Sequence, residues 1–305
     1  MTAQHGCFSQ LETSALAGRG GSFREAFRSA KATAIVVLVF GVIIGAITLF
    51  ALISGVTQLI TGVDRTDAAT PTAARLTAVP GLIFSLVLFG AAVFFIVRFF
   101  RDAFRRQRMA EFARANGLEF VGYRSGAQLR GVGFQAPGDA RWHSHVVRGV
   151  AQGHPFELGD FEVTEEQRSA KGRKRTVTVT RFAYLAAGMP LRIPHTFFDA
   201  TQNGKWRRWT GALVRWDLEG HFPTQFRTFT ERGREREMLE VISPDIMQVF
   251  SVHGLGHDIE LNGAQLVLMH PGTSVAKRPG LDALLSRGSA ITAELDSRIP
   301  AWHRG

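Results

Sequence analysis

The sequence of 305 residues has a single cysteine, Cys7, so no intrachain disulfide can form, and this usage is compatible with a reducing compartment. It contains no GxxxxGK[ST] loop, no GxGxxG that joins a strand to a helix, and no GxSxG nucleophile elbow. These absences argue against a phosphoryl-transfer enzyme and a hydride-transfer enzyme. The apolar segment after residue 31 is far longer than the ~7–15 residues of a signal-peptide core, so no secretory signal is predicted.

Charge is also missing from two long stretches, and these predict two transmembrane helices. No charged residue lies between Lys31 and Asp64 or between Arg75 and Arg98. Residues 34–53 are apolar apart from Thr48, and twenty such residues at ~1.5 Å each span a ~30 Å hydrocarbon core. A buried helical hairpin of a soluble protein is the alternative, but two stretches of this length are rare outside membranes. We expect an N-terminal segment at 1–31, transmembrane helices at 32–60 and 79–100, and a short external loop at 61–78.

Positive charge flanks the predicted helices on one side, which fixes their orientation. The net charge of the chain is +10, and residues 98–114 hold six arginines against two acidic residues. The loop at 61–78 contains only Arg65 and Arg75 as basic residues. By the positive-inside rule, both termini are expected in the cytoplasm, in a cell membrane protein with two passes. Within the first helix, Gly41 and Gly45 form a GxxxG pair, which we interpret as the contact between the two helices.

Two basic segments are expected to meet anionic lipid headgroups at the membrane interface. The first is a juxtamembrane helix at 101–116 that continues the second span, and the alternative for it is a solvated stalk. The second is a cluster in which two tryptophans flank two arginines, a combination suited to headgroup depth, although an ordinary strand entry would also explain it. The predicted interface residues are Arg98, Arg101, Arg105, Arg106, Arg108, Trp206, Arg207, Arg208 and Trp209.

From residue 117 to 305 the pattern changes to that of a soluble α+β domain. Strands are predicted at 118–123, 145–150, 156–163, 175–185, 210–216 and 226–230. A helix is predicted at 234–249, bent or divided by Pro244, and a final helix at 281–299. Asn262-Gly263 between apolar runs is the strongest short signal for a β-hairpin, because both positions favour positive φ. The expected fold class is therefore α+β: a two-helix transmembrane hairpin followed by an antiparallel-sheet domain with late helices.

Several short motifs resemble those of an uncharacterised family of actinobacterial membrane proteins, which have two spans and a cytoplasmic α+β domain. The resemblance runs from the first helix to near the end of the chain, and it implies the same architecture without implying any activity or catalytic residue. The motifs that carry it are residues 112–117, 156–161, 193–200, 220–222 with Phe226, 243–247 and 259–268.

Histidines are the candidates for chemistry in the domain. His143 and His145 alternate, so on a regular strand both would face one side and could share a metal, although a zinc site needs three or four ligands. His195 and Asp199 lie in one motif and could form an acid–base pair, but no nucleophile accompanies them. Ordinary structural histidines are the simpler interpretation.

The sequence favours a membrane-anchored, non-enzymatic binding or scaffold protein that presents a cytoplasmic α+β domain. The alternative is a metal-dependent or hydrolytic membrane-bound enzyme that uses histidines of that domain. No cofactor and no nucleic-acid partner is predicted, since no known nucleic-acid motif accompanies the basic charge. The expected partners are the lipid bilayer, its anionic headgroups and an unidentified protein. A transporter subunit is disfavoured, because neither span contains an internal ionisable residue.

Overall fold

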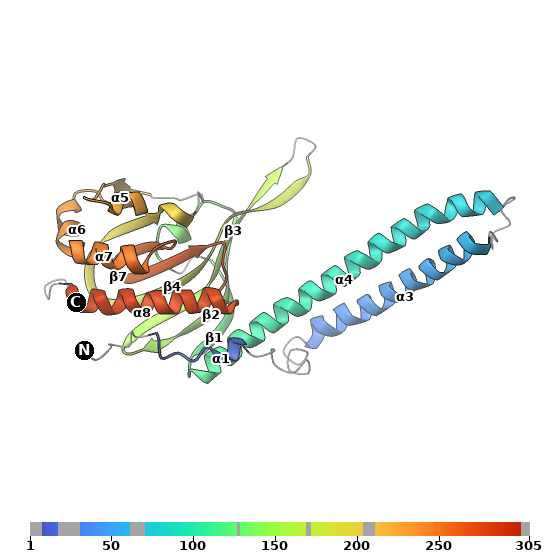
Figure 1. The fold of residues 1–305 in the computed structure, drawn as a ribbon, viewed down its shortest axis with the longest axis horizontal. Coiled ribbons are helices and arrows are strands. Elements are labelled where there is room, and N and C mark those ends of the chain that lie inside the picture. The colour runs from blue at the N-terminus through green and yellow to red at the C-terminus, as the bar shows by residue number, and fades with distance from the viewer. Residues whose placement is uncertain are drawn as a thin grey trace. The chain divides into compact units, whose positions relative to one another are not determined.

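The computed structural model describes residues 8–17, 31–61, 71–126, 129–168, 172–203 and 211–299 (Figure 1). The chain divides into two compact units. One unit is residues 21–107, and the other combines residues 1–20 with residues 108–305.

The first unit contains helix α3 (Lys31–Thr61) and most of helix α4 (Pro71–Ala115), which continues into the second unit. α4 begins at Pro71, a residue type suited to the first turn of a helix, so residues 71–78, which were expected in the loop, are helical. Gly41 allows a close approach between the helices, because a Cβ atom there would lie 2.6 Å from Cδ1 of Ile96. Gly45 has no such neighbour within 4 Å, so only the first glycine of the GxxxG pair makes the predicted contact.

In the part of the chain that the structure describes, one helix is long and apolar enough to cross a membrane. It is the segment Val79–Ala115 of α4, whose most apolar window has a mean hydropathy of 2.5 and is only 6% buried within the protein. A core helix of a soluble protein would be mostly buried. The described apolar part of α3, Gly41–Thr57, is shorter. One predicted span is thus supported by length and composition, and the two-span arrangement stays a prediction.

The second unit is built on a seven-stranded antiparallel sheet, which confirms the predicted α+β class. Six strands lie in the order β1-β2-β3-β4-β6-β5, and β7 pairs with β4. The strands are β1 (Glu119–Ser125), β2 (Ala140–Ala151), β3 (His154–Arg168), β4 (Lys174–Ala200), β5 (Leu213–Arg215), β6 (Phe226–Glu231) and β7 (Asp258–Pro271).

The helices of this unit are short except for the last. They are α1 (Ser14–Ala17), α5 (Phe222–Gln225), α6 (Glu235–Val241), α7 (Pro244–His253) and α8 (Arg278–Arg298), with 3₁₀ turns η1 (Gly133–Gln135) and η2 (Thr201–Asn203). The prediction that Pro244 divides the helix at 234–249 is confirmed. α6 ends at Val241, and Ser243 caps α7 by accepting a hydrogen bond from the Ile246 amide at 3.4 Å.

The predicted hairpin at Asn262-Gly263 is wrong, because β7 passes through these residues as one strand. Gly263 does adopt positive φ, at 59°. The pairing of β7 with β4 is irregular at this point, since it jumps from Gly188–Gln265 to Ile193–Gly263. The left-handed glycine therefore lies at an irregularity in which β4 has extra residues opposite β7, and the chain does not reverse.

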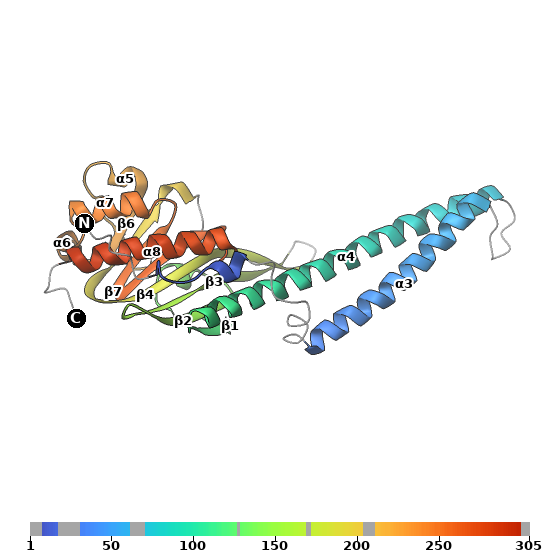
Figure 2. The same ribbon diagram turned by 60° about the horizontal axis from the view of Figure 1, so that its bottom comes forward.

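The two faces of the sheet bury different residues because side chains alternate along each strand. On β7, Leu266 and Leu268 belong to a large core, and Val267 and Met269 belong to a smaller one. The large core lies between the sheet and helices α5–α8, which gather on one face (Figure 2). We call this the helix-covered face. On the other face, here the loop-covered face, Val132, Phe134 and Ala136 pack against the strands.

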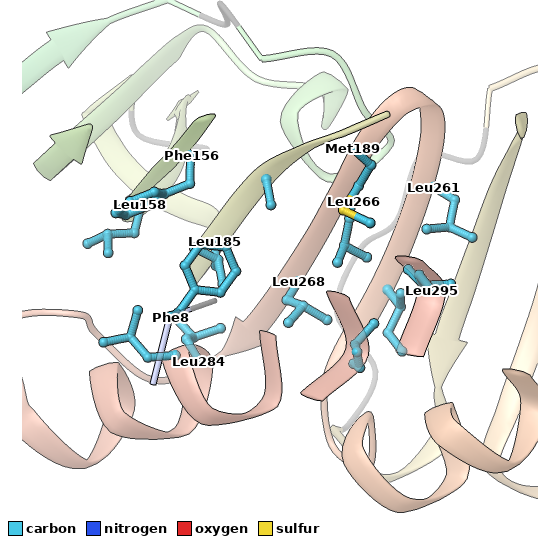
Figure 3. Close-up of a cluster of buried hydrophobic side chains, with 14 of the residues drawn as sticks. Phe8, Phe156, Leu158, Leu185, Met189, Leu261, Leu266, Leu268, Leu284 and Leu295 are labelled. Carbon is cyan, nitrogen blue, oxygen red and sulfur yellow. The ribbon is translucent and has the colours of Figure 1, made fainter. Parts of the chain in front are cut away.

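The N-terminal segment, predicted to be separate, belongs to the helix-covered core. Phe8 is 0% exposed and stacks edge-on with Phe156 at 5.2 Å between ring centroids (Figure 3). Its amide donates a hydrogen bond of 2.8 Å to Ser289 Oγ of α8. Further along, the Glu12 amide donates to Asn116 Oδ1 at 2.7 Å, and Asn116 Nδ2 donates back to the Glu12 carbonyl at 3.0 Å. Residues 8–17 are therefore an integral part of the domain.

Candidate functional site

The interface arginines predicted near the second span, Arg98 to Arg108, lie on α4. Arg98, Arg101, Arg105 and Arg108 are spaced by three or four residues, so they share one face of the helix, and Arg106 lies off it. Arg105 forms an ion pair with Asp102 at 3.3 Å. The second predicted cluster, Trp206, Arg207, Arg208 and Trp209, lies outside the described residues.

The prediction that His143 and His145 face the same side is wrong. His143 is buried, and its Nδ1 lies 2.9 Å from the Tyr184 hydroxyl on the loop-covered face. His145 adopts positive φ, 56°, within a bulge between Ser144 and Val147. Its Nδ1 instead contacts Asp160 Oδ2 at 3.0 Å. The bulge adds a residue to the strand, which breaks the period of two on which the prediction depended. Among the described residues, no group of three or more His, Cys, Asp or Glu residues could hold a metal ion.

His195 and Asp199 also have different partners from those expected. Asp199 forms an ion pair with Arg227 at 2.7 Å. His195 Nε2 lies 2.5 Å from Oε1 of Glu260, which is 0% exposed. The same carboxylate accepts the Val132 amide at 2.8 and 3.0 Å. Glu260 thereby attaches the segment that contains η1 to the sheet, and it holds a histidine that is 26% exposed.

Glu157 on β3 is the centre of a buried polar network that we call the Glu157 network. Its carboxylate accepts two hydrogen bonds from Arg124, at 2.8 and 3.0 Å, and one from Arg148 Nε at 2.7 Å. The Tyr184 hydroxyl donates a fourth, at 2.7 Å, and His143 contacts the same hydroxyl. Burial alone would raise the pKa of Glu157, but the hydrogen bonds from Tyr184, Arg148 and Arg124 outweigh it and lower the pKa. The carboxylate is therefore charged at neutral pH.

The strand register explains how this network forms. Arg148 of β2 is directly opposite Glu157, and Gly159 is opposite Tyr184 of β4. A Cβ atom on Gly159 would lie only 2.9 Å from the Tyr184 hydroxyl oxygen, so glycine leaves the space that the phenol ring occupies. Burial, assisted by the positive charge of Arg124, lowers the pKa of His143 to about 4. The ring is therefore neutral and buried at neutral pH.

A cavity of about 530 Å³ lies between the η1 segment and the start of β2. Its polar lining includes Asp139 and Arg141, but both side chains already bind backbone groups. Asp139 Oδ2 accepts the Glu166 amide at 2.7 Å, and Arg141 Nη2 donates to the Ala136 carbonyl at 2.9 Å. These contacts hold the segment in place, so the lining does not define a particular ligand.

No protein-family model and no curated protein sequence matches the chain. Among solved structures, the mycobacterial trehalose monomycolate transport factor A, TtfA, is similar at a TM-score of 0.38 and 8% sequence identity. The match covers 61% of this chain and 94% of that one. A likeness at this level carries no argument about function.

Proposed function

We propose that this chain is a two-pass membrane protein that presents a non-enzymatic binding or scaffold domain at the cytoplasmic face. The observation that carries the proposal is the packing of residues 8–17 in the core of the unit that resumes at Arg108. Because both segments fold together, they occupy the same side of any membrane. The chain between them must then cross the membrane an even number of times.

An even number of crossings favours two spans. The apolar segment of α4 is long enough for one crossing. If α4 crosses, a second crossing is required, and the charge-free run in α3 is the segment available for it. The arginine-rich stretch at residues 98–114, in the C-terminal part of α4, favours the cytoplasm as the shared compartment. We also propose membership of the uncharacterised actinobacterial two-span family, on the motifs given above.

A binding role is supported by the way in which the domain uses its candidate catalytic residues. His143 binds Tyr184, and His145 binds Asp160, which also accepts hydrogen bonds from Ser274 Oγ and the Val275 amide. These contacts hold strands and loops together. The polar groups of the domain thus form internal hydrogen bonds that make it rigid, and a rigid surface suits the binding of a partner.

Cysteine labelling in intact cells tests the topology. In a Cys7→Ser background, Thr66→Cys places a thiol in the predicted external loop, and Ser286→Cys places one on the exposed side of α8. A membrane-impermeant maleimide should label Thr66→Cys in intact cells and Ser286→Cys only after permeabilisation. Labelling of Ser286→Cys in intact cells would overturn the cytoplasmic placement. Failure to label Thr66→Cys before permeabilisation, with labelling after it, would overturn the two-pass topology.

In-cell crosslinking with mass spectrometry tests the binding role. The tagged full chain should capture a small, reproducible set of proteins that a chain ending at Asn116 does not capture. Equal capture by both chains would assign the interaction to the membrane helices and count against a scaffold domain.

The His195–Glu260 pair is the observation that favours the alternative, a hydrolytic membrane-bound enzyme. A partly exposed imidazole held by a buried carboxylate is the arrangement of a general base and the group that orients it. Screening the full chain against ester and phosphoester substrates, with His195→Gln as the matched variant, separates the two proposals. Turnover that His195→Gln abolishes without a change in thermal stability would favour the enzyme.

A further inference from the structure

The ends of β3 and β4 extend past the rest of the sheet as a two-stranded ribbon (Figure 1). β2 pairs with β3 only as far as Thr164, and β7 pairs with β4 only from Phe182 onward. Residues 165–168 and 174–177 therefore pair with each other, and no third strand from the described part of the chain joins them. We call these residues the β3–β4 arm. An isolated two-stranded ribbon is marginally stable in water, so an arm of this kind benefits from a binding partner.

The tip of the arm is strongly basic and exposed. Arg168, Arg173, Lys174 and Arg175 are all exposed there. Arg168 lies directly opposite Lys174 in the register, and like charges that face each other across strands are destabilising. Lys174 has an ion pair with Glu166 at 3.0 Å, but both side chains are more than half exposed, so this pair offsets little of the repulsion.

An anionic surface would relieve this repulsion. The covalent link between the domain and the proposed membrane span keeps such a surface nearby. Ten residues of continuous α-helix separate Arg98, at the end of the charge-free run, from Arg108, where the second unit begins. That length corresponds to about 15 Å. Such a tether keeps the domain at high local concentration near the bilayer in every orientation. The cytoplasmic leaflet carries anionic lipids that attract clusters of Lys and Arg.

We propose that the basic tip of the β3–β4 arm docks on the anionic headgroups of the membrane that anchors the protein. This inference rests on the proposed membrane anchoring and adds a second, reversible contact to it. The arm and the helix then restrict how the domain rotates on its tether, so that one surface of the sheet remains available to a partner. Each basic side chain near an anionic surface shifts the ratio of docked to free arm about fivefold.

A fluorescent label on the arm tests the proposal in the full chain. Cys7→Ser with Thr176→Cys carries a polarity-sensitive dye, and the protein is placed in nanodiscs that contain headgroup spin-labelled quencher lipid. The discs are made of phosphatidylcholine alone or of an equal mixture with phosphatidylglycerol. Quenching should appear in the mixture, be weak in phosphatidylcholine alone, and fall at high salt because surface charges are screened. The same dye on Ser286→Cys should not respond to the lipid composition.

Neutralising the tip is the decisive variant. Arg173→Gln, Lys174→Gln and Arg175→Gln together should lower the docked-to-free ratio roughly a hundredfold, from three fivefold steps. The matched control is Arg232→Gln, Arg236→Gln and Lys277→Gln, which removes the same charge from exposed positions elsewhere and should leave the quenching unchanged. Equal quenching in both lipid compositions, or loss of quenching in both triple variants, would overturn the proposal.

Two further measurements distinguish this proposal from the anchoring proposal and from nucleic-acid binding. A dye on Phe94→Cys, quenched by acyl-chain spin labels, reports whether α4 crosses the bilayer. If Phe94→Cys is quenched and Thr176→Cys does not respond to phosphatidylglycerol, the arm proposal fails and the anchoring proposal stands. If an RNA oligonucleotide changes the emission at Thr176→Cys and phosphatidylglycerol does not, the arm is a nucleic-acid contact and the lipid assignment is wrong.

Discussion

The helix-covered and loop-covered faces of the sheet are closed by different interactions. On the helix-covered face, apolar side chains from α5–α8, the end of α4, the N-terminal segment and the strands form one continuous core. On the loop-covered face, a short segment around Phe134 packs on a smaller apolar cluster, next to the Glu157 network and Glu260. A face with many covering elements can depend on buried area. A thinly covered face depends on directional hydrogen bonds, whose loss leaves buried polar groups unpaired.

The largest expected effect concerns the helix-covered face. Phe8→Ala should destabilise the domain by ~3–5 kcal/mol, because it removes a buried aromatic ring and leaves a cavity. For a unit of this size we expect the melting temperature, followed by tryptophan fluorescence in nanodiscs, to fall by about 10 °C. The control is Leu239→Ala, which is 46% exposed and should change it little. An unchanged melting temperature for Phe8→Ala would show that the N-terminal segment does not pack in the core. The argument for an even number of crossings would then fail.

On the loop-covered face the comparable substitution is Glu157→Gln. It leaves Arg124 buried beside a neutral group, and breaking such a pair costs ~3–5 kcal/mol in fully buried sites. Since the Glu157 side chain is 10% exposed and an amide retains some hydrogen bonds, we expect about 2–3 kcal/mol here. Glu166→Gln, in an exposed pair, should cost ~0–1 kcal/mol. Equal, small effects of both substitutions in denaturant titrations would show that the network does not hold this face.

The pH dependence of stability sharpens the comparison. Burial, with Arg124, lowers the pKa of His143 from 6.5 to about 4. In the unfolded chain, His143 binds a proton below pH 6.5, whereas in the folded domain it does not bind one until about pH 4. The contribution of neutral His143 to the free energy of unfolding is therefore fully present above pH 6.5 and is lost as the pH falls toward 4. The loss should be about 3 kcal/mol by pH 4, since each pH unit between the two pKa values costs ~1.4 kcal/mol. His143→Phe should flatten this slope in urea titrations at several pH values. The slope due to His257, whose pKa burial and His270 lower to about 3, should persist.

The smallest of these effects belongs to Tyr184→Phe. This variant keeps the buried ring and removes one hydroxyl that donates to Glu157 and contacts His143. The expected cost is about 1–2 kcal/mol, since the hydroxyl bonds a charged group. In a double-mutant cycle, Tyr184→Phe should cost much less when Glu157 is already Gln. Additive costs would mean that the two side chains act independently.

Features that depend on local chemistry could be predicted from the sequence. The strands at β1–β3 and the break at Pro244 were predictable, because period-two patterns and proline act locally. The error at Asn262-Gly263 came from the same local chemistry. Positive φ at Gly263 is compatible with a turn or with a strand irregularity, and pairing with β4 selected the irregularity. His143 and His145 failed similarly, since a bulge cannot be seen in the alternation of residue types.

Features that depend on contacts between distant parts of the chain gave a weak local signal or none. Phe8 is one aromatic residue in a polar segment, and its partners on α8 lie about 280 positions away. Glu157 and Glu260 were detectable in part, because a glutamate inside an apolar strand run indicates a buried charge that needs a partner. The identities of the partners, Arg124 and Tyr184 for Glu157 and Val132 for Glu260, depend on register and on a loop that crosses the sheet. Sequence patterns alone do not specify either.

The hydrogen bond between Phe8 and Ser289 also sets an order of events during synthesis. The segment around Phe8 leaves the ribosome early, whereas α8, which completes its binding site, leaves it last. In the proposed two-pass topology, membrane insertion of the intervening helices would precede the closure of the core, and the N-terminal segment would stay exposed in the meantime. A chain in which only one of the two helices inserts would place these two ends on opposite sides of the bilayer and leave the core open, as a target for proteolysis. Under this topology, survival of the protein would depend on the insertion of both helices.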